Sequence, residues 1–336
     1  MKRQLEPGAE LEGFTIEACI HSGSIAHVYR VRHSLALRDP GFPLAMKVPR
    51  RAVAEGVQDT VSFEVENHIM QVLKGPHVPR FVATGDLQNM PYLVMEYVHG
   101  KSLGHWLGAS ERPAVDALAR LGVAVARAVH SLHQQNTVHL DLKPANVLIR
   151  DDGSAVLLGL GLSFHAHYPD LLAGQLSRAV GSPAWMAPEQ VVGVRGDLRS
   201  DIFAIGVMLY QLATGELPFG SPRTTAGLRQ RLWTEPAPLR GLRPDLPEWM
   251  QEVIVNCLQS EAARRYPSAA HLAFDLNYPE QVIVTERGRK VQRSRAATYF
   301  RRWFKATGLH YQPSPLPALQ AATLKSDLTP DKDAPF

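Results

Sequence analysis

A short polar loop near the middle of the chain has the residue types that phosphoryl transfer needs. Residues 139–146 read His-Leu-Asp-Leu-Lys-Pro-Ala-Asn. Phosphoryl transfer involves little covalent chemistry, so a protein has to position the phosphate, neutralise its charge and orient the attacking hydroxyl. Asp141 could accept the hydroxyl proton, Lys143 could hold the transferring phosphate and Asn146 could bind a metal ion. The spacing is specific, and we therefore prefer this hypothesis to a polar loop without function.

The elements around this loop predict a mainly helical unit. Residues 114–133 are apolar at helical spacing and lead into the loop, and residues 147–149 form an apolar strand after it. An Asp-Gly turn then predicts a two-stranded hairpin over residues 147–158. The apolar run at residues 202–212 is too short to span a bilayer, so we expect a buried helix there.

The part of the chain before about residue 90 predicts an antiparallel sheet with one helix. Residues 14–20, 26–32 and 44–48 are strand-like, and turn residues separate them. A helix is expected over residues 58–74, with an apolar face. Lys47 lies within the third strand, where a lone lysine would be costly unless an acid pairs with it.

The 139–146 motif resembles the catalytic loop of eukaryotic-type protein kinases. Its Lys-Pro pair resembles the serine/threonine-specific branch rather than the tyrosine one, and the segments around Trp185 and Phe274 resemble bacterial members. The resemblance runs from about Phe14 to Leu276. It implies an α+β, bilobal protein-kinase fold that transfers the γ-phosphate of ATP to serine or threonine hydroxyls of a protein substrate. The expected parts are an N-lobe of an antiparallel sheet plus one helix (1–95), a mainly helical C-lobe (96–278) and a tail (279–336).

The resemblance assigns phosphate-binding roles in the N-lobe. Lys47 would contact the α- and β-phosphates, and Glu66 would orient Lys47, with Glu64 as the competing choice. Residues 21–28 occupy the place of the glycine-rich loop, but of its three glycines only Gly23 is present. Backbone amides approach phosphates closely where Cβ is absent, so we expect this loop to be stiffer and to hold phosphates less closely.

Residues 96–100 resemble the hinge between the lobes. The backbone of Glu96 and Val98 would supply the donor and acceptor for adenine, and Met95 would be the gatekeeper. Apolar walls with a few polar anchors are usual for such a pocket. The side chains expected to sandwich the ring are those of Ile20, Val28, Ala45 and Leu148.

One triplet departs from the kinase pattern in a way that affects the chemistry. Where the family has Asp-Phe-Gly, residues 159–161 read Gly-Leu-Gly. The missing aspartate normally holds the metal ion that joins the β- and γ-phosphates, so Gly159 predicts weak or metal-atypical use of Mg or Mn. Asn146 would remain as a metal ligand. Asp152 and Asp170 are the nearest acids on either side, and neither is well placed to substitute.

Other positions imply structural and regulatory properties. Leu140 replaces the usual arginine beside Asp141, so control by phosphorylation of the following segment is less expected. The resemblance implies a buried pair between Glu189 and Arg265, and backbone hydrogen bonds from the catalytic loop to Asp201. Ser182 corresponds to the residue that helps to select serine or threonine acceptors.

The composition agrees with a globular enzyme. The chain is 45% apolar, enough for a sizeable core in two lobes. Cys19 and Cys257 lie far apart in the sequence, which favours a reduced compartment without a disulfide framework. The first residues lack the apolar core of a signal peptide. We therefore expect a cytoplasmic protein.

The basic residues gather in the tail. Residues 281–305 alternate basic and aromatic side chains, which favours a basic amphipathic helix. A solvated or C-lobe-docked extension is the preferred interpretation. Docking on an acidic partner is the next alternative, and a membrane surface or nucleic acid is less favoured. Residues 313–336 are rich in Pro, Ser, Asp and Ala, without a core pattern, and predict disorder.

Three functions remain open from the sequence. The first is a serine/threonine protein kinase with weak or metal-atypical activity. The second is a pseudokinase that serves as a nucleotide-binding or scaffolding signalling module, favoured by Gly159 and the poor glycine loop. The third is a kinase-fold enzyme that acts on a small molecule. Residues 182–185, which resemble a protein-substrate platform, argue against it.

Overall fold

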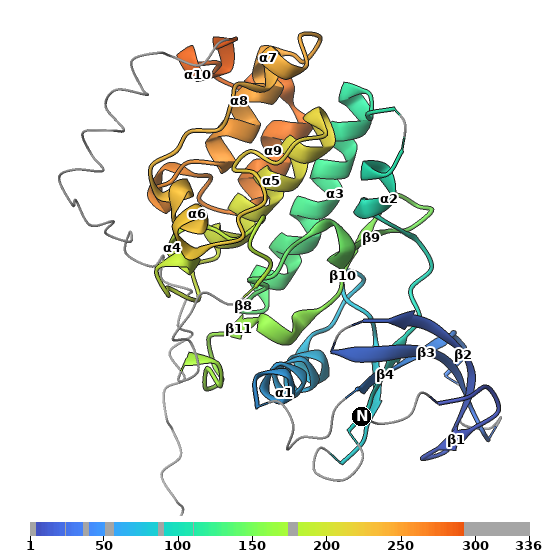
Figure 1. Ribbon diagram of the computed structural model, residues 1–336. Coiled ribbons are helices and arrows are strands. Elements are labelled where there is room, and N and C mark those ends of the chain that lie inside the picture. The colour runs from blue at the N-terminus through green and yellow to red at the C-terminus, as the bar shows by residue number, and fades with distance from the viewer. Residues whose placement is uncertain are drawn as a thin grey trace, which may run out of the picture.

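The computed structural model describes residues 5–23, 25–35, 40–50, 57–86, 91–109, 111–173 and 181–291. These residues form two lobes, with an antiparallel sheet and one helix in the first and mainly helices in the second (Figure 1). The predicted bilobal α+β fold is confirmed.

The N-lobe is built on a six-stranded antiparallel sheet with the strand order β1-β2-β3-β4-β6-β5. Helix α1 (Val57–Val72) lies beside it. Its strands are β1 (Glu10–Leu11), β2 (Phe14–Ser22), β3 (Ala26–His33), β4 (Leu44–Pro49), β5 (Phe81–Thr84) and β6 (Leu93–Glu96).

The two faces of this sheet have different tasks. Directly paired residues of antiparallel strands share a face, and successive residues alternate between faces. Tyr29 pairs with Met46, and both are buried in the N-lobe core. Val28 pairs with Lys47 on the opposite face. Alternation in the sequence thus separates a core face from a face that is free for a ligand.

The C-lobe is organised around α5 (Arg199–Thr214), which is buried along almost its whole length. Long helices α3 (Val115–Gln134), α8 (Glu248–Cys257) and α9 (Ala269–Asn277) surround it (Figure 1). The shorter helices are α2 (Leu103–Leu107), α4 (Pro188–Val191), α6 (Thr225–Arg229), α7 (Leu239–Leu242) and α10 (Glu286–Arg289). None of the helices in the described part of the chain is long and apolar enough to cross a membrane.

Two small sheets flank the catalytic-loop residues 139–146. The first has the order β10-β9-β7, from β7 (Lys101–Ser102), β9 (Val147–Ile149) and β10 (Ala155–Leu157). The expected hairpin is present there, and its turn uses Gly153 at a positive φ of 81°. The second pairs β8 (Thr137–Val138) with β11 (Phe164–His165). The catalytic-loop residues 139–146 lie between β8 and β9, as the sequence predicts.

A charged brace joins the hinge to both lobes. The Glu96 carboxylate accepts from Arg80 of the N-lobe at 3.1 Å and from Arg150 of the C-lobe at 2.9 Å. Arg150 also donates to the carbonyl of Pro76 at 3.0 Å. Beside it, the amide of Leu157 donates to a carbonyl of the same N-lobe loop. The β9–β10 hairpin is thereby fixed to the loop after α1.

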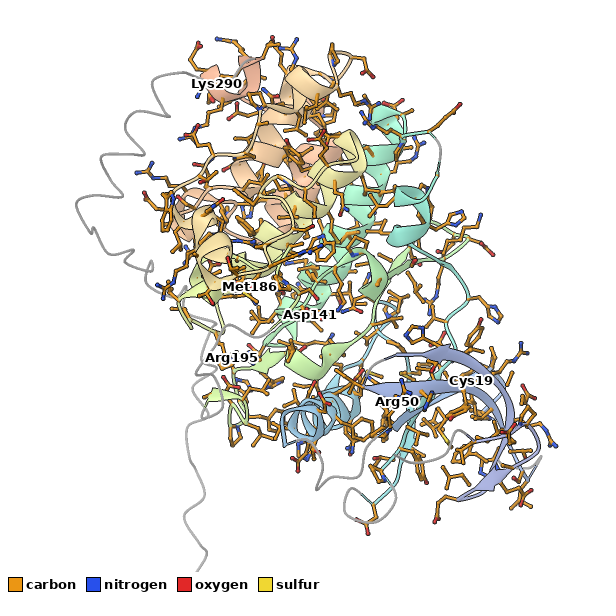
Figure 2. The ribbon with its side chains drawn as sticks, viewed as in Figure 1. Cys19, Arg50, Asp141, Met186, Arg195 and Lys290 are labelled. Carbon is orange, nitrogen blue, oxygen red and sulfur yellow. The ribbon has the colours of Figure 1, made fainter. Side chains whose placement is uncertain are left out.

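The chain continues on the C-lobe surface beyond the expected boundary at residue 278. Gln251 of α8 is fully buried, and its side-chain amide donates to the carbonyls of Arg287, Gly288 and Lys290 at 2.8–2.9 Å. These bonds fix α10 against α8. Figure 2 shows Lys290 at the end of the C-lobe far from the N-lobe. Residues 292–305 of the basic segment, and all of 313–336, lie outside the described residues.

Candidate active site

A cavity of about 870 Å³ lies between the lobes and is lined by residues from both. Asp141 lies near the centre of the molecule, where the N-lobe meets the C-lobe helices (Figure 2). Every residue proposed from the sequence to bind ATP or to act in catalysis lines this cavity. The fold therefore brings together side chains from positions 20 to 148 of the chain.

The strand lysine finds its acid on α1. Nζ of Lys47 donates to Oε2 of Glu66, whose side chain is only 5% exposed. Glu64, the competing choice, is not among the residues that line the cavity. Helix α1 is held close by Gly161, where an added Cβ would lie 2.8 Å from the carbonyl oxygen of Ser62. This close approach keeps Glu66 over the cavity.

The carboxylate of Asp141 is held at both oxygens. The amide of Ser182 donates to Oδ1 at 2.9 Å, and Nζ of Lys143 donates to Oδ2 at 3.0 Å. The same Lys143 Nζ donates to Oγ of Ser182 at 2.9 Å. Asp141, Lys143 and Ser182 thus form one cluster. A carboxylate with both oxygens engaged has a fixed orientation, as a base toward a substrate hydroxyl requires.

Buried side chains of the C-lobe hold the backbone of the catalytic loop in place. The amides of His139 and Leu140 donate to the two carboxylate oxygens of Asp201 at 2.8 and 2.9 Å. Leu140 adopts a left-handed φ of 62°, and the Gln190 side chain donates to its carbonyl at 2.8 Å. Burial alone raises the pKa of Asp201, but His133 and the hydrogen bonds bring it below its ordinary value. Asp201 therefore stays ionised and fixes the loop.

Asn146 and Gly159 lie against each other. The side-chain amide of Asn146 donates to the carbonyl of Asp141 at 2.9 Å. Gly159 has left-handed backbone angles (φ 72°, ψ 52°), and an added Cβ would lie 2.9–3.0 Å from the amide atoms of Asn146. Leu160, after it, is fully buried in the core. The triplet thus keeps an apolar anchor while it loses the acid beside Asn146.

The hinge backbone lies at the cavity, where an adenine site was predicted. The backbone amide of Glu96 donates to the carbonyl of Arg80, and the backbone amide of Tyr97 donates to the carbonyl of Pro43. No hydrogen bond to another described residue engages the Val98 amide, so it is available as a donor. The Glu96 side chain turns into the brace and leaves its backbone at the cavity. The four predicted apolar walls, Ile20, Val28, Ala45 and Leu148, line the same space.

The remaining glycine of the β2–β3 turn has its backbone polar groups occupied. The Gly23 amide donates to the carbonyl of Ala26 at 3.0 Å, and its carbonyl accepts from Arg50 at 2.9 Å. Gly23 lines the cavity, but its amide closes the turn and is not free for a phosphate.

The segment after Gly159 is fixed by contacts of the chain itself. Arg195 donates to the Asp170 carboxylate at 2.7 Å and to the carbonyl of Leu162 at 3.0 Å. Strand β11 pairs with β8, and Leu172 is fully buried. The segment up to residue 173 is therefore held without an arginine at position 140.

A buried ion pair joins the end of this segment to the C-lobe. Glu189 accepts from two nitrogens of Arg265 at 2.7 and 2.8 Å and from Ser200 at 2.7 Å. Burial acts to raise the pKa of Glu189, but the charge and hydrogen bonds of Arg265, with Ser200, bring it below its ordinary value. The predicted pair of Glu189 and Arg265 is thus present.

Several side chains at the site were not assigned a role from the sequence. Asp59 lines the cavity from α1, on the same helical face as Glu66. Because the two acids are seven residues apart, two turns of a helix, the sequence spacing could have revealed Asp59 as a cavity residue. His21 lines the cavity at the place of a family glycine. Gln190 and Arg195 act through contacts between distant loops, for which the sequence carries no periodic signal.

The described residues do not fit the metal site that the family pattern requires. They contain no group of three or more His, Cys, Asp or Glu that could hold a metal ion. The carboxylate beside Asn146 is replaced by Gly159, and the Glu66 carboxylate is used by Lys47. Hard cations need several oxygen ligands. The described residues therefore lack the carboxylate that would share a divalent ion with Asn146.

Comparison with known proteins agrees with this geometry. Residues 14–275 match the protein kinase domain family. A probable serine/threonine-protein kinase of Corynebacterium efficiens is 28% identical over 82% of this chain and 42% of its own length. The serine/threonine-protein kinases pkn2 and Pkn1 of Myxococcus xanthus are 30% and 35% identical, over 77% and 59% of this chain and 31% and 29% of their own lengths.

The chain belongs to the protein kinase family, and the relatives named above are bacterial serine/threonine-protein kinases. The family in general uses ATP and a divalent metal ion. The chain spans less than half the length of these relatives.

Proposed function

We propose that this chain transfers the γ-phosphate of ATP to serine or threonine hydroxyls of a protein substrate, with weak or metal-atypical catalysis. The observation that carries the proposal is the Asp141–Lys143–Ser182 cluster, which faces the same cavity as the Lys47–Glu66 pair. A module that has lost catalysis has no need for a carboxylate aligned at both oxygens.

The chemistry follows from this arrangement. A substrate hydroxyl bound beside Asp141 loses its proton to the carboxylate while its oxygen forms a bond to the γ-phosphorus. The bond between that phosphorus and the β,γ-bridging oxygen breaks, and ADP leaves. Lys143 is placed to stabilise the charge on the transferred group, and Lys47, oriented by Glu66, is placed to hold the phosphates that remain with ADP.

Gly159 sets the expected rate. The carboxylate that it replaces would supply a metal-based stabilisation of several kcal/mol. A loss of about 4 kcal/mol slows a reaction about a thousandfold. We therefore expect slow transfer that responds atypically to Mg and Mn.

A pseudokinase is the second candidate. Gly159 and the occupied amide of Gly23 favour it, because both remove groups that hold phosphates. In that case the module would bind nucleotide, or would act only as a signalling scaffold.

The decisive experiment measures transfer from radiolabelled ATP to a generic basic protein, with Mg, with Mn and without added metal. We expect slow transfer by the wild type and a further loss of about 10²–10⁴-fold in Asp141→Asn, since that is the usual contribution of a general base. Asp116→Asn, an equal charge change at an exposed site on α3, is the matched control and should leave the rate unchanged. Transfer that persists in Asp141→Asn would contradict the assignment of Asp141.

Gly159→Asp tests the second candidate. It should increase the Mg-dependent rate, although the Asn146 amide has to shift by a few tenths of an ångström to admit the new Cβ. A silent wild type that becomes active only as Gly159→Asp would favour the pseudokinase. A thermal-shift titration with ATP then separates a nucleotide binder from a scaffold.

A further inference from the structure

The β2–β3 hairpin, which would form the phosphate-binding roof of the cavity, lacks the usual backbone hydrogen-bond donors. In the β2–β3 hairpin the amide of Gly23 is bonded to Ala26, and the other two glycine positions of the family pattern carry His21 and Ala26. A metal carboxylate is absent at Gly159 as well. A bound nucleoside triphosphate would therefore meet a roof with few groups to balance its negative charge.

Strand register places His21 where such a group is needed. His21 pairs with Val28 across β2 and β3, and Val28 pairs with Lys47 across β3 and β4. Directly paired residues share a face, so the three side chains form one row on the cavity face. Two strand spacings of about 4.8 Å separate the backbone of His21 from that of Lys47 by roughly 10 Å. All three residues line the cavity.

The ring of His21 covers the turn. An added Cβ on Gly23 would lie 3.2 Å from Nε2 of His21, so the imidazole lies directly beside this glycine. A register shift in β2 between Cys19 and His21 brings the histidine into line with Val28. The imidazole thus lies beside the turn, at a position where the family pattern has a glycine without a side chain.

Among the basic side chains that line the described cavity, His21 differs from the two lysines because they are paired with acids. Lys47 is paired with Glu66, and Lys143 is paired with Asp141. His21 is the third basic side chain among the described lining residues, and no described residue hydrogen-bonds or ion-pairs with its ring. Its side chain is exposed to the open cavity.

We propose that the His21 imidazole hydrogen-bonds the β- and γ-phosphates of a nucleoside triphosphate and takes over part of the task of the missing glycines and metal carboxylate. The assignment rests on the nucleotide site of the proposed function, but it does not require phosphate transfer. It predicts that binding energy from His21 grows with the number of phosphates and is absent for adenosine.

Isothermal titration with adenosine, ADP and ATP in the presence of EDTA tests this prediction. His21→Leu should weaken ATP binding about tenfold, since hydrogen bonds to charged groups are roughly twice as strong as neutral ones, and it should leave adenosine binding unchanged. His21→Arg should bind ATP at least as tightly as the wild type. His68→Leu, at an exposed histidine of α1 that does not line the cavity, is the matched control and should show wild-type binding.

The outcomes separate the roles. Equal weakening of adenosine and ATP by His21→Leu would show that His21 only shapes the hairpin and would overturn the assignment. Unchanged ATP affinity in His21→Leu, or no binding of any of the three ligands by the wild type, would overturn it too. A phosphate-dependent loss in a protein that shows no transfer supports the role of His21 while it removes the proposed kinase activity.

Discussion

Gly159 combines a chemical loss with a conformational demand. Its left-handed backbone positions Leu160 in the core and keeps the triplet beside Asn146. Residues with a Cβ lose about 1–2 kcal/mol in this conformation, and Asn and Asp lose less because their short polar side chains bond locally. The position is thus suited to glycine or to the aspartate of the family pattern.

We expect Gly159→Ala to lower the free energy of unfolding by about 1–2 kcal/mol or more, because the left-handed backbone adds to a tight contact with Asn146. Gly159→Asn should cost less. Gly108→Ala, at a negative φ of −84° with room for a methyl group, is the matched control and should be nearly neutral. Urea unfolding of the three variants checks the order. Equal losses at positions 159 and 108 would contradict it.

At the scale of elements, the segment after Gly159 is ordered by Arg195 and Asp170. The guanidinium joins a carboxylate and a carbonyl of the same segment, and both side chains are largely buried. A kinase that relies on an arginine beside its catalytic aspartate needs a phosphate to complete such a contact. Here an aspartate supplies the negative charge permanently.

We expect Arg195→Ala to increase amide hydrogen exchange across residues 163–173 about tenfold or more, because the Asp170 carboxylate and the Leu162 carbonyl lose their donor. Arg264→Ala removes an exposed pair with Glu261 and is the matched control. Exchange measured by mass spectrometry, before and after phosphatase treatment of the wild type, tests the idea. Deprotection of the wild-type segment by phosphatase would show that a phosphate, and not Asp170, orders it.

The sequence predicted the elements better than the contacts between loops. Alternation marked β2, β3 and β4, and helical spacing marked α1 and α3, because burial of one face imposes a period. The spacing 139–146 placed Asp141, Lys143 and Asn146, since a short loop leaves little freedom. The Arg195–Asp170 bond joins two irregular segments 25 residues apart, and no local pattern encodes it. The closed amide of Gly23 likewise depends on the geometry of the turn.

For the whole molecule, stability depends on buried carboxylates that must stay ionised. Glu189 joins the end of the segment after Gly159 to Arg265, and Asp201 joins the catalytic loop to α5. The folded-state pKa of each lies below its ordinary value. Each therefore contributes stability that is fully present above its unfolded-state pKa and is lost as the pH falls through the folded-state pKa.

We expect the free energy of unfolding to fall once the pH drops below about 4.5, the ordinary value for Glu189. Glu189→Gln should lower it by about 3–5 kcal/mol at pH 7, because it leaves the Arg265 guanidinium buried without its anion. Its difference from the wild type should shrink in acid. Glu261→Gln, in an exposed pair, is the control. Denaturant titrations at pH 7 and below pH 4 measure both, and a difference independent of pH would contradict this account.

The brace at Glu96 has a consequence for nucleotide exchange. Arg150 joins the C-lobe to the hinge carboxylate and to the carbonyl of Pro76, so rotation of one lobe against the other has to break two hydrogen bonds of its guanidinium at once. The β2–β3 hairpin is joined to the rest of the N-lobe by its strand pairing and by Arg50. Nucleotide exchange should therefore proceed with little change in the angle between the two lobes.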